Sequence, residues 1–152
     1  MRLAEALQER ADLNRKIAEL TDRLRNNALV QEGEKPLEDP AALLKELDKA
    51  TVRLGKLMAQ INRTNSAAVV EGRTITERLA ERDALTLQLS SYRSLIEAAS
   101  QNTRRARGTE IKILPTVDVA ALQKKADAMA KKLRENDNLL QQANWTTDLQ
   151  ES

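Results

Sequence analysis

The sequence predicts an all-α protein of four long antiparallel helices, arranged as coiled-coil-like hairpins or as a bundle. Two observations predict this fold. In four separate segments, apolar residues recur alternately three and four positions apart, which is a heptad pattern. The composition also favours helices, since 32% of the residues are charged and Leu and Ala make up most of the 41% that are hydrophobic.

The first two helices are expected over residues 2–26 and 40–64. Asn26 and Asn27 end the first helix, because Asn tolerates left-handed backbone. Asp39 caps the free amides of the second helix, and Pro40 fits its first position. Their predicted seams consist of Leu3, Ala6, Arg10, Leu13, Ile17, Leu20 and Leu24, and of Leu43, Leu47, Ala50, Leu54, Leu57 and Ile61.

The third and fourth helices are expected over residues 75–99 and 119–143. Thr74 and Glu77 have the spacing of a capping box at the start of the third helix. Asp118 is the expected cap of the fourth helix. Their predicted seams consist of Ile75, Arg78, Arg82, Leu85, Leu89, Tyr92, Ile96 and Ala99, and of Val119, Leu122, Ala126, Met129, Leu133, Asn136, Leu140 and Ala143.

The connectors contain two pieces with strand character. Residues 69–70 are a Val pair, and residues 111–117 alternate between apolar and polar side chains. We expect these two pieces to pair as a short β structure, with Pro115 restricting the second to an edge. The whole chain, residues 1–152, is expected to form one helical domain.

Several function classes are disfavoured by what the sequence lacks. It contains no His and no Cys, and its four Gly are isolated, so we expect no catalytic, metal or cofactor site. No apolar run approaches the roughly twenty residues that span a membrane. The beginning of the sequence has no apolar segment of the secretory kind, so we expect a cytoplasmic protein.

Three arginines, Arg10, Arg78 and Arg82, occupy seam positions. Their stems can pack along the seam while the guanidinium reaches water or a neighbouring Glu. Alternatively they form a buried ionic layer that fixes register, using Glu81 or Asp83 of a facing helix. An anion site is a third interpretation, and we favour the first two. Asn136 in the fourth seam either fixes register in the same way or marks a position where the seam frays.

Arg78, Arg82 and the two aromatic residues, Tyr92 and Trp145, are candidates for an interface. Tyr92 lies in the third seam, and Trp145 follows the fourth helix. Trp is enriched among the residues that anchor protein interfaces. Covering the open end of a bundle is an equally good interpretation of Trp145.

One basic cluster suggests phosphate contacts. Arg104, Arg105 and Arg107 lie close together in the last connector, and Lys112 follows them. Such residues position nucleic-acid backbones. No aromatic residue is interleaved for base stacking, and the net charge of +2 is small. Nucleic-acid binding is therefore the alternative and not the main hypothesis.

The chain resembles a family of small bacterial proteins that carry the label septicolysin. The most distinctive matching stretches are Thr-Val-Asp-Val-Ala-Ala-Leu-Gln at residues 116–123 and Gln-Ala-Asn-Trp-Thr-Thr at residues 142–147. Shorter matches lie at residues 3–7, 30–33, 61–65 and 110–112. The resemblance implies a small helical bacterial protein of unknown role and supplies no catalytic residues. Lytic activity, which the label suggests, is disfavoured because every predicted helix is charged on its outer face.

The main hypothesis is a non-enzymatic helical interaction or scaffold protein. Its seams leave apolar surface that one hairpin cannot cover, so we expect self-association, most simply as a dimer. The alternative is a nucleic-acid- or ribosome-associated factor that uses the basic loop at residues 104–107.

Overall fold

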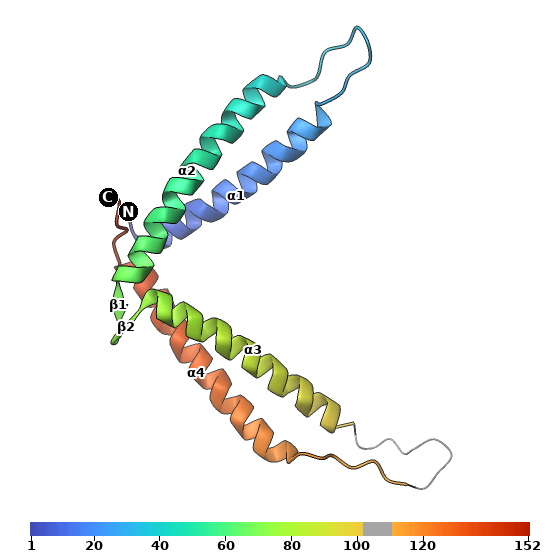
Figure 1. The fold of residues 1–152 in the computed structure, drawn as a ribbon, viewed down its shortest axis with the longest axis vertical. Coiled ribbons are helices and arrows are strands. Elements are labelled where there is room, and N and C mark those ends of the chain that lie inside the picture. The colour runs from blue at the N-terminus through green and yellow to red at the C-terminus, as the bar shows by residue number, and fades with distance from the viewer. Residues whose placement is uncertain (102–110) are drawn as a thin grey trace. The chain divides into compact units, whose positions relative to one another are not determined.

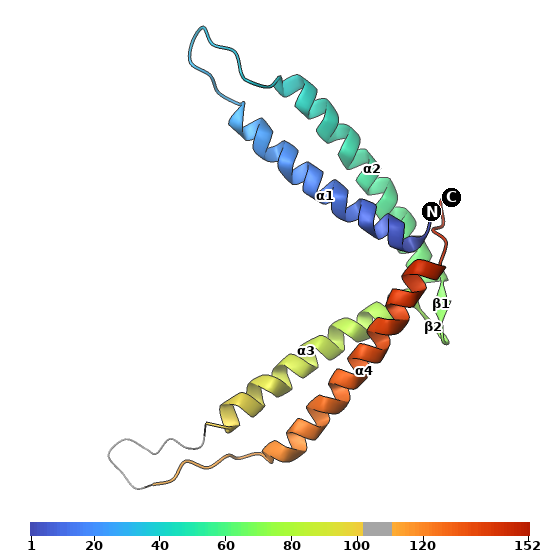
Figure 2. The same ribbon diagram turned by 180° about the vertical axis from the view of Figure 1, so that it is seen from behind.

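A computed structural model describes residues 1–101 and 111–152 and confirms the all-α fold. Its elements are α1 (Leu3–Asn26), α2 (Pro40–Ala67), β1 (Val69–Val70), β2 (Arg73–Thr74), α3 (Ile75–Ala99) and α4 (Val119–Thr146). α1 and α2 lie side by side as one helical hairpin, and α3 and α4 as another (Figures 1 and 2).

The chain divides into two compact units. Unit 1 comprises Met1–Val69 and Ala143–Ser152, and unit 2 comprises Val70–Gln142. We call the α1/α2 pair the first hairpin and the α3/α4 pair the second hairpin. The expectation that the chain forms a single domain concerns cooperative folding, and it stays a prediction.

Helix starts follow the predicted capping residues. Asp39 accepts a hydrogen bond from the Ala41 amide at 3.1 Å, and Asp118 accepts one from the Ala121 amide at 3.1 Å. α3 begins with the predicted capping box, in which the Thr74 hydroxyl accepts from the Glu77 amide and the Glu77 carboxylate accepts from the Thr74 amide.

Helix ends agree less closely with the sequence. α2 and α4 each continue three residues past their predicted ends at residues 64 and 143. Asn27 ends α1 with φ −111°, so the expected left-handed backbone is wrong. The Asn27 side chain caps the end of α1 instead, because its amide nitrogen donates to the Arg23 carbonyl at 2.8 Å.

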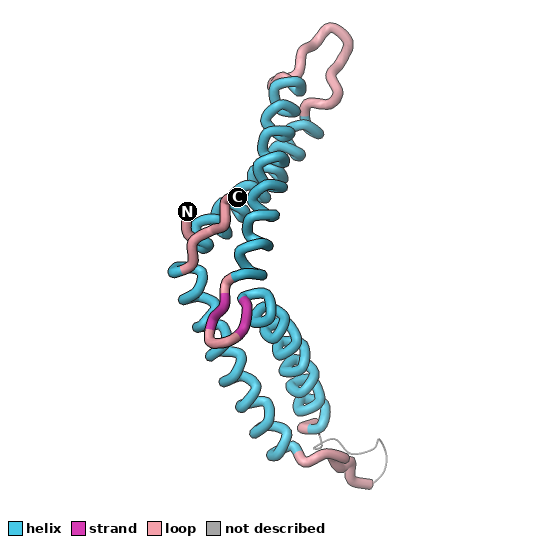
Figure 3. The backbone as a smooth tube through the Cα atoms, turned by 60° about the vertical axis from the view of Figure 1, so that its left-hand side comes forward, coloured by secondary structure: helices cyan, strands magenta, loops and turns pink. Residues whose placement is uncertain are grey.

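The β piece exists, but its predicted partner was wrong. β1 pairs with β2, forming the two-stranded sheet that follows α2 in the chain (Figure 3). Glu71 (φ +46°) and Gly72 (φ +82°) join the strands. Positive φ at both central residues is the geometry of a type I′ turn, whose twist matches that of paired strands. A local hairpin closes a short loop, so it is favoured over pairing with residues 111–117.

Each core lies between the two helices of its hairpin, along the predicted seams. Every predicted seam residue is buried or half-buried. In unit 1 the most deeply buried large side chains are Leu3, Leu20, Leu57 and Ile61. In unit 2, Ile75, Leu85 and Leu89 of α3 are buried, as are Ala126 and Leu140 of α4.

Unit 1 is closed by both ends of the chain. The Leu3 amide donates to the Thr147 carbonyl at 2.8 Å, and the Leu149 amide donates to the Met1 carbonyl at 2.9 Å. Leu149 is buried. The Thr147 carbonyl thus satisfies one of the free amides at the start of α1. The Gln150 amide in turn donates to the buried hydroxyl of Thr64, at 2.9 Å.

Candidate interaction surfaces

The loop between α1 and α2, residues 27–39, is held at its base by an ion pair. The Arg23 Nε donates to both carboxylate oxygens of Glu38 at 3.1 Å, and the Arg23 Nη2 also contacts this carboxylate. This hydrogen bonding lowers the pKa of Glu38 and raises that of Arg23, against a smaller opposing effect of desolvation. The two ends of the loop are therefore joined by a fork-shaped, charge-assisted contact.

Two further contacts order the loop. The Asn27 carbonyl oxygen Oδ1 accepts from the Glu38 amide at 3.0 Å, across the mouth of the loop. At the apex, the Glu34 amide donates to the Gln31 carbonyl at 2.9 Å, with Gly33 between them at φ +88°. This backbone conformation is one that Gly adopts at little cost. The loop is thus fixed by hydrogen bonds and not by a packed core.

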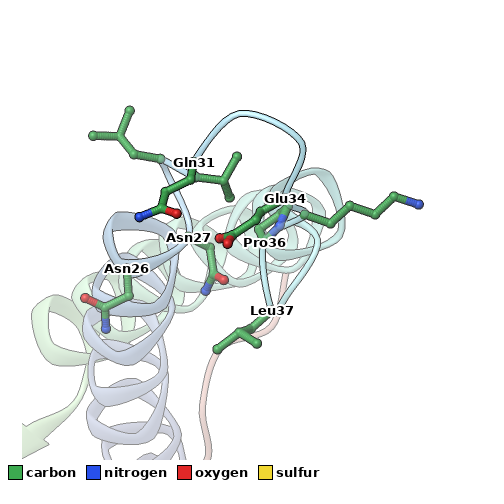
Figure 4. Close-up of a pocket in the computed structure, with 9 residues that line it drawn as sticks. Asn26, Asn27, Gln31, Glu34, Pro36 and Leu37 are labelled. Carbon is green, nitrogen blue, oxygen red and sulfur yellow. The ribbon is translucent and has the colours of Figure 1, made fainter.

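This ordered loop exposes aliphatic side chains. Leu37 is 100% exposed, Leu29 is 90% exposed, and Val30 is also exposed. The loop encloses an open hollow of about 580 Å³. Asn26 and Asn27 of the α1 end line it together with Gln31, Glu34, Pro36 and Leu37 of the loop (Figure 4).

The same loop is acidic. Glu32 and Glu34 are both exposed beside the aliphatic side chains, and Lys35 is the one basic residue in the loop. We call Leu29, Val30, Glu32, Glu34 and Leu37 the acidic tip. Sequence reasoning did not identify this surface, although the apolar Leu29 and Val30 next to a Gly- and Pro-containing stretch were visible signals.

The connector of the second hairpin also exposes aliphatic side chains. Leu114 is 71% exposed, and Ile111 and Ile113 are exposed as well. Lys112, a predicted phosphate contact, is exposed between them. We call Ile111, Lys112, Ile113 and Leu114 the basic segment. The other predicted phosphate contacts, Arg104, Arg105 and Arg107, lie outside the described residues.

Arg78, a predicted interface residue, lies inside unit 2. Arg78 is buried, with 8% of its surface exposed. Its Nε donates to the Val70 carbonyl at 2.8 Å and its Nη2 to the Glu71 carbonyl at 3.1 Å, so it holds the turn between β1 and β2. Its Nη1 donates to Asn136 Oδ1 at 3.3 Å, and Asn136 Nδ2 donates back to the Arg78 carbonyl at 2.9 Å.

This reciprocal Arg78–Asn136 pair joins α3 to α4. That Asn136 sets the register of the two helices stays a prediction. The partners of Arg78 are one side-chain amide and two backbone carbonyls. The expected carboxylate, Glu81, instead contacts Arg73 at 2.7 Å and Lys132 at 3.5 Å. A guanidinium bonded to backbone carbonyls satisfies its donors without a carboxylate.

The remaining interface candidates lie at or near the surface. Arg82 is half-buried and contacts its own neighbour, Asp83, at 3.1 Å. Tyr92 is half-buried in the seam of α3, and Trp145 is exposed in the last turn of α4. Unlike Arg78, these three side chains reach solvent, and their role in an interface stays a prediction.

Ionisable groups outside these surfaces form structural pairs. Within residues 1–101 and 111–152, no group of three acidic residues comes close enough to hold a metal ion. Glu9 accepts two hydrogen bonds from Arg53, at 2.6 and 2.7 Å, which lower the pKa of Glu9.

Among the described helices, none is long and apolar enough to cross a membrane.

The fold is thus a pair of helical hairpins, and the described parts of their connectors expose aliphatic side chains. The chain belongs to DUF6847, a family of unknown function, which matches residues 10–149. It is similar to a functionally unknown conserved protein from Corynebacterium diphtheriae, whose crystal structure is 41% identical in sequence and has a TM-score of 0.91. The similarity covers 99% of both chains. No match was found among curated proteins.

Proposed function

We propose that this protein is a non-enzymatic, cytoplasmic scaffold that associates with a second copy of itself through the seam faces of its hairpins. The observation that supports this proposal is incomplete burial of the seams. In the first hairpin, Leu13, Ile17, Leu47 and Leu54 are seam residues, yet each is only half-buried. In a two-helix hairpin, each seam is covered only by the facing helix, so its flanks stay accessible to water. Additional helices, such as those of a second copy, are needed to bury the seam residues fully.

Two exposed apolar side chains, Leu44 and Met58, flank the seam of α2 and lie fourteen residues apart, with the polar Thr51 midway between them. We call these three positions the stripe on α2. This spacing of two heptads places them on one line along the helix. Burying such a line against another copy removes apolar surface from water, which is the usual driving force for association.

Sedimentation equilibrium of the full chain at two salt concentrations tests the proposal. We expect a mass of at least twice 17.0 kDa at both salt concentrations, because salt does not screen the apolar seam contact. A mass of 17.0 kDa at both salt concentrations would show that the chain is a monomer and would overturn the proposal.

A variant tests which face is used. Leu44→Glu/Met58→Glu should shift the mass towards 17.0 kDa, since two charges would be buried in the contact. Ala42→Glu/Ala59→Glu adds the same charge to exposed positions off this line and is the matched control. If both double variants keep the wild-type mass, the stripe on α2 is not the contact.

Nucleic-acid binding through Arg104, Arg105 and Arg107 stays a prediction of the sequence. It would appear as binding to RNA or DNA that weakens with salt and is lost when the three arginines are replaced. Lytic activity, which the septicolysin label suggests, is not expected, and failure to release dye from liposomes would exclude it. The scaffold proposal expects neither activity.

A further inference from the structure

The two connectors are chemically complementary. Both present exposed branched aliphatic side chains, Leu29, Val30 and Leu37 in the acidic tip and Ile111, Ile113 and Leu114 in the basic segment. The acidic tip adds two exposed carboxylates to its aliphatic surface, and the basic segment adds the exposed ammonium of Lys112. By sequence, Arg104, Arg105 and Arg107 outnumber the one acidic residue, Glu110, in residues 101–110, so this part of the connector carries a net positive charge as well.

The acidic tip is ordered before any partner arrives. Its base is joined by Arg23 and Glu38, and the Asn27 side chain spans its mouth. Leu37 is nevertheless fully exposed, so this order does not come from packing of the aliphatic side chains. A surface that is already ordered loses little conformational entropy on binding, which favours a docking role.

We infer that the acidic tip of one copy docks on the basic segment of a second copy. Its two exposed carboxylates, Glu32 and Glu34, disfavour a second acidic tip, an anionic lipid surface or a nucleic acid as the occupant. The basic segment of another copy matches both the aliphatic and the ionic character of the tip. Apolar contact then supplies the burial, and the opposite charges fix orientation.

This contact differs from the proposed seam contact and does not depend on it. It is heterologous, because one copy contributes its acidic tip and the other its basic segment. After one such contact, the first copy keeps its basic segment free and the second keeps its acidic tip free, so the contacts close into a ring or continue as a chain of copies. Seam association, in contrast, joins equivalent surfaces.

Disulfide crosslinking in the full chain tests the inference without interference from native thiols, because the sequence has no Cys. Leu37→Cys and Leu114→Cys are mixed and oxidised, and the products are separated without reductant. We expect covalent dimers that join the two variants, in several-fold excess over either variant oxidised alone. Both side chains are exposed, so circular dichroism should show unchanged folding.

A matched control measures random collision. Val52→Cys replaces a side chain on α2 that is 74% exposed, close to the 71% of Leu114. Mixed with Leu37→Cys, where it stands in for Leu114→Cys, it should give few crosslinks. Equal yields for the two mixtures would overturn the inference, as would a dominant Leu37→Cys homodimer. A Leu37→Cys/Leu114→Cys chain that oxidises within itself would also overturn it.

Charge reversal separates this contact from the seam contact. Glu34→Lys in the Leu37→Cys chain should lower the crosslink yield several-fold, and Lys112→Glu in the Leu114→Cys chain should restore it. The crosslink should survive in the Leu44→Glu/Met58→Glu background, where the seam contact is removed. If the Leu37→Cys and Leu114→Cys chains give no mixed crosslink while the wild-type chain still self-associates, the inference alone is overturned. If the mixed crosslink forms but Leu44→Glu/Met58→Glu leaves the native mass unchanged, the seam contact of the proposed scaffold alone is overturned.

Discussion

The two hairpins share one design but fix their helices differently. Among the described residues, ten buried apolar residues belong to unit 1 and five to unit 2. Each hairpin has one ion pair between its helices among the described residues, Glu9–Arg53 in the first and Glu81–Lys132 in the second. Unit 2 adds a buried polar pair, Arg78 and Asn136, between α3 and α4.

This difference shows that a heptad seam specifies pairing but leaves register to other groups. Apolar residues seven apart pack almost as well after a shift by one heptad, so a directional contact must decide between registers. In the first hairpin, the Glu9–Arg53 ion pair is a directional contact between α1 and α2. In the second hairpin, the buried Arg78–Asn136 pair is a directional contact between α3 and α4.

The largest expected effect is in the apolar core. Leu57 is fully buried in unit 1, and Leu57→Ala should lower the free energy of unfolding by about 3 kcal/mol. Leu85 of unit 2 is buried less completely, so Leu85→Ala should cost about 2 kcal/mol. Denaturant unfolding of both variants measures the difference. Equal losses would show that the two cores are equally tight.

The polar pair of unit 2 comes next. Asn136→Leu leaves the Arg78 guanidinium with one fewer partner and should cost about 2 kcal/mol of unfolding free energy. Arg78→Met/Asn136→Leu replaces both polar groups, so its cost should be smaller than the sum of the single variants. A double-mutant cycle measures this coupling. Additive losses would mean that the two side chains act independently.

Substitutions in the turn between β1 and β2 should change stability by an intermediate amount, one lowering it and the other raising it. Gly72 has φ +82°, so Gly72→Ala should destabilise unit 2 by about 1 kcal/mol. Glu71 has φ +46°, a conformation that Asn adopts more readily, so Glu71→Asn should stabilise by about 0.5 kcal/mol. Thermal unfolding measures both. Opposite signs are expected because the turn Asn-Gly is the favoured type I′ pair.

The smallest effect is ionic and depends on pH. Glu9→Gln removes the half-exposed pair with Arg53 and should cost about 0.5 kcal/mol at neutral pH. The folded-state pKa of Glu9 is lowered from 4.5, so its stabilisation is present above that pH and is lost as the pH falls through the lowered pKa. Unfolding at several pH values should show wild type and variant converging in acid. A constant gap would exclude the ion pair as its cause.

Local signals explain why the helices were predictable. Caps such as Asp39 and Thr74 act within four residues, and the heptad seams mark the inward face of each helix. Contacts between distant segments left no such signal. Nothing local indicates that Arg78 binds the carbonyls of a turn, or that Leu149 packs against the start of the chain. The isolated Leu149 in a polar tail was the one available clue.

The candidate surfaces were only partly predictable for the same reason. Sequence reasoning identified the basic connector through its charge, but it passed over the acidic tip. Exposure of Leu37 depends on how Arg23, Asn27 and Glu38 hold the loop, which is a three-dimensional property. Arg78 was proposed for an interface because it occupies a seam position, and it proved to be an internal contact of unit 2.

Closure of unit 1 by both chain ends has a consequence for the order of folding during synthesis. α1 and α2 emerge from the ribosome first, yet unit 1 lacks its last hydrogen bonds until residues 147–150 are available. Unit 2 is continuous in sequence and can be completed earlier. The first hairpin to be synthesised is therefore expected to be the last to reach its final stability, because the segment that closes unit 1, residues 143–152, is synthesised last.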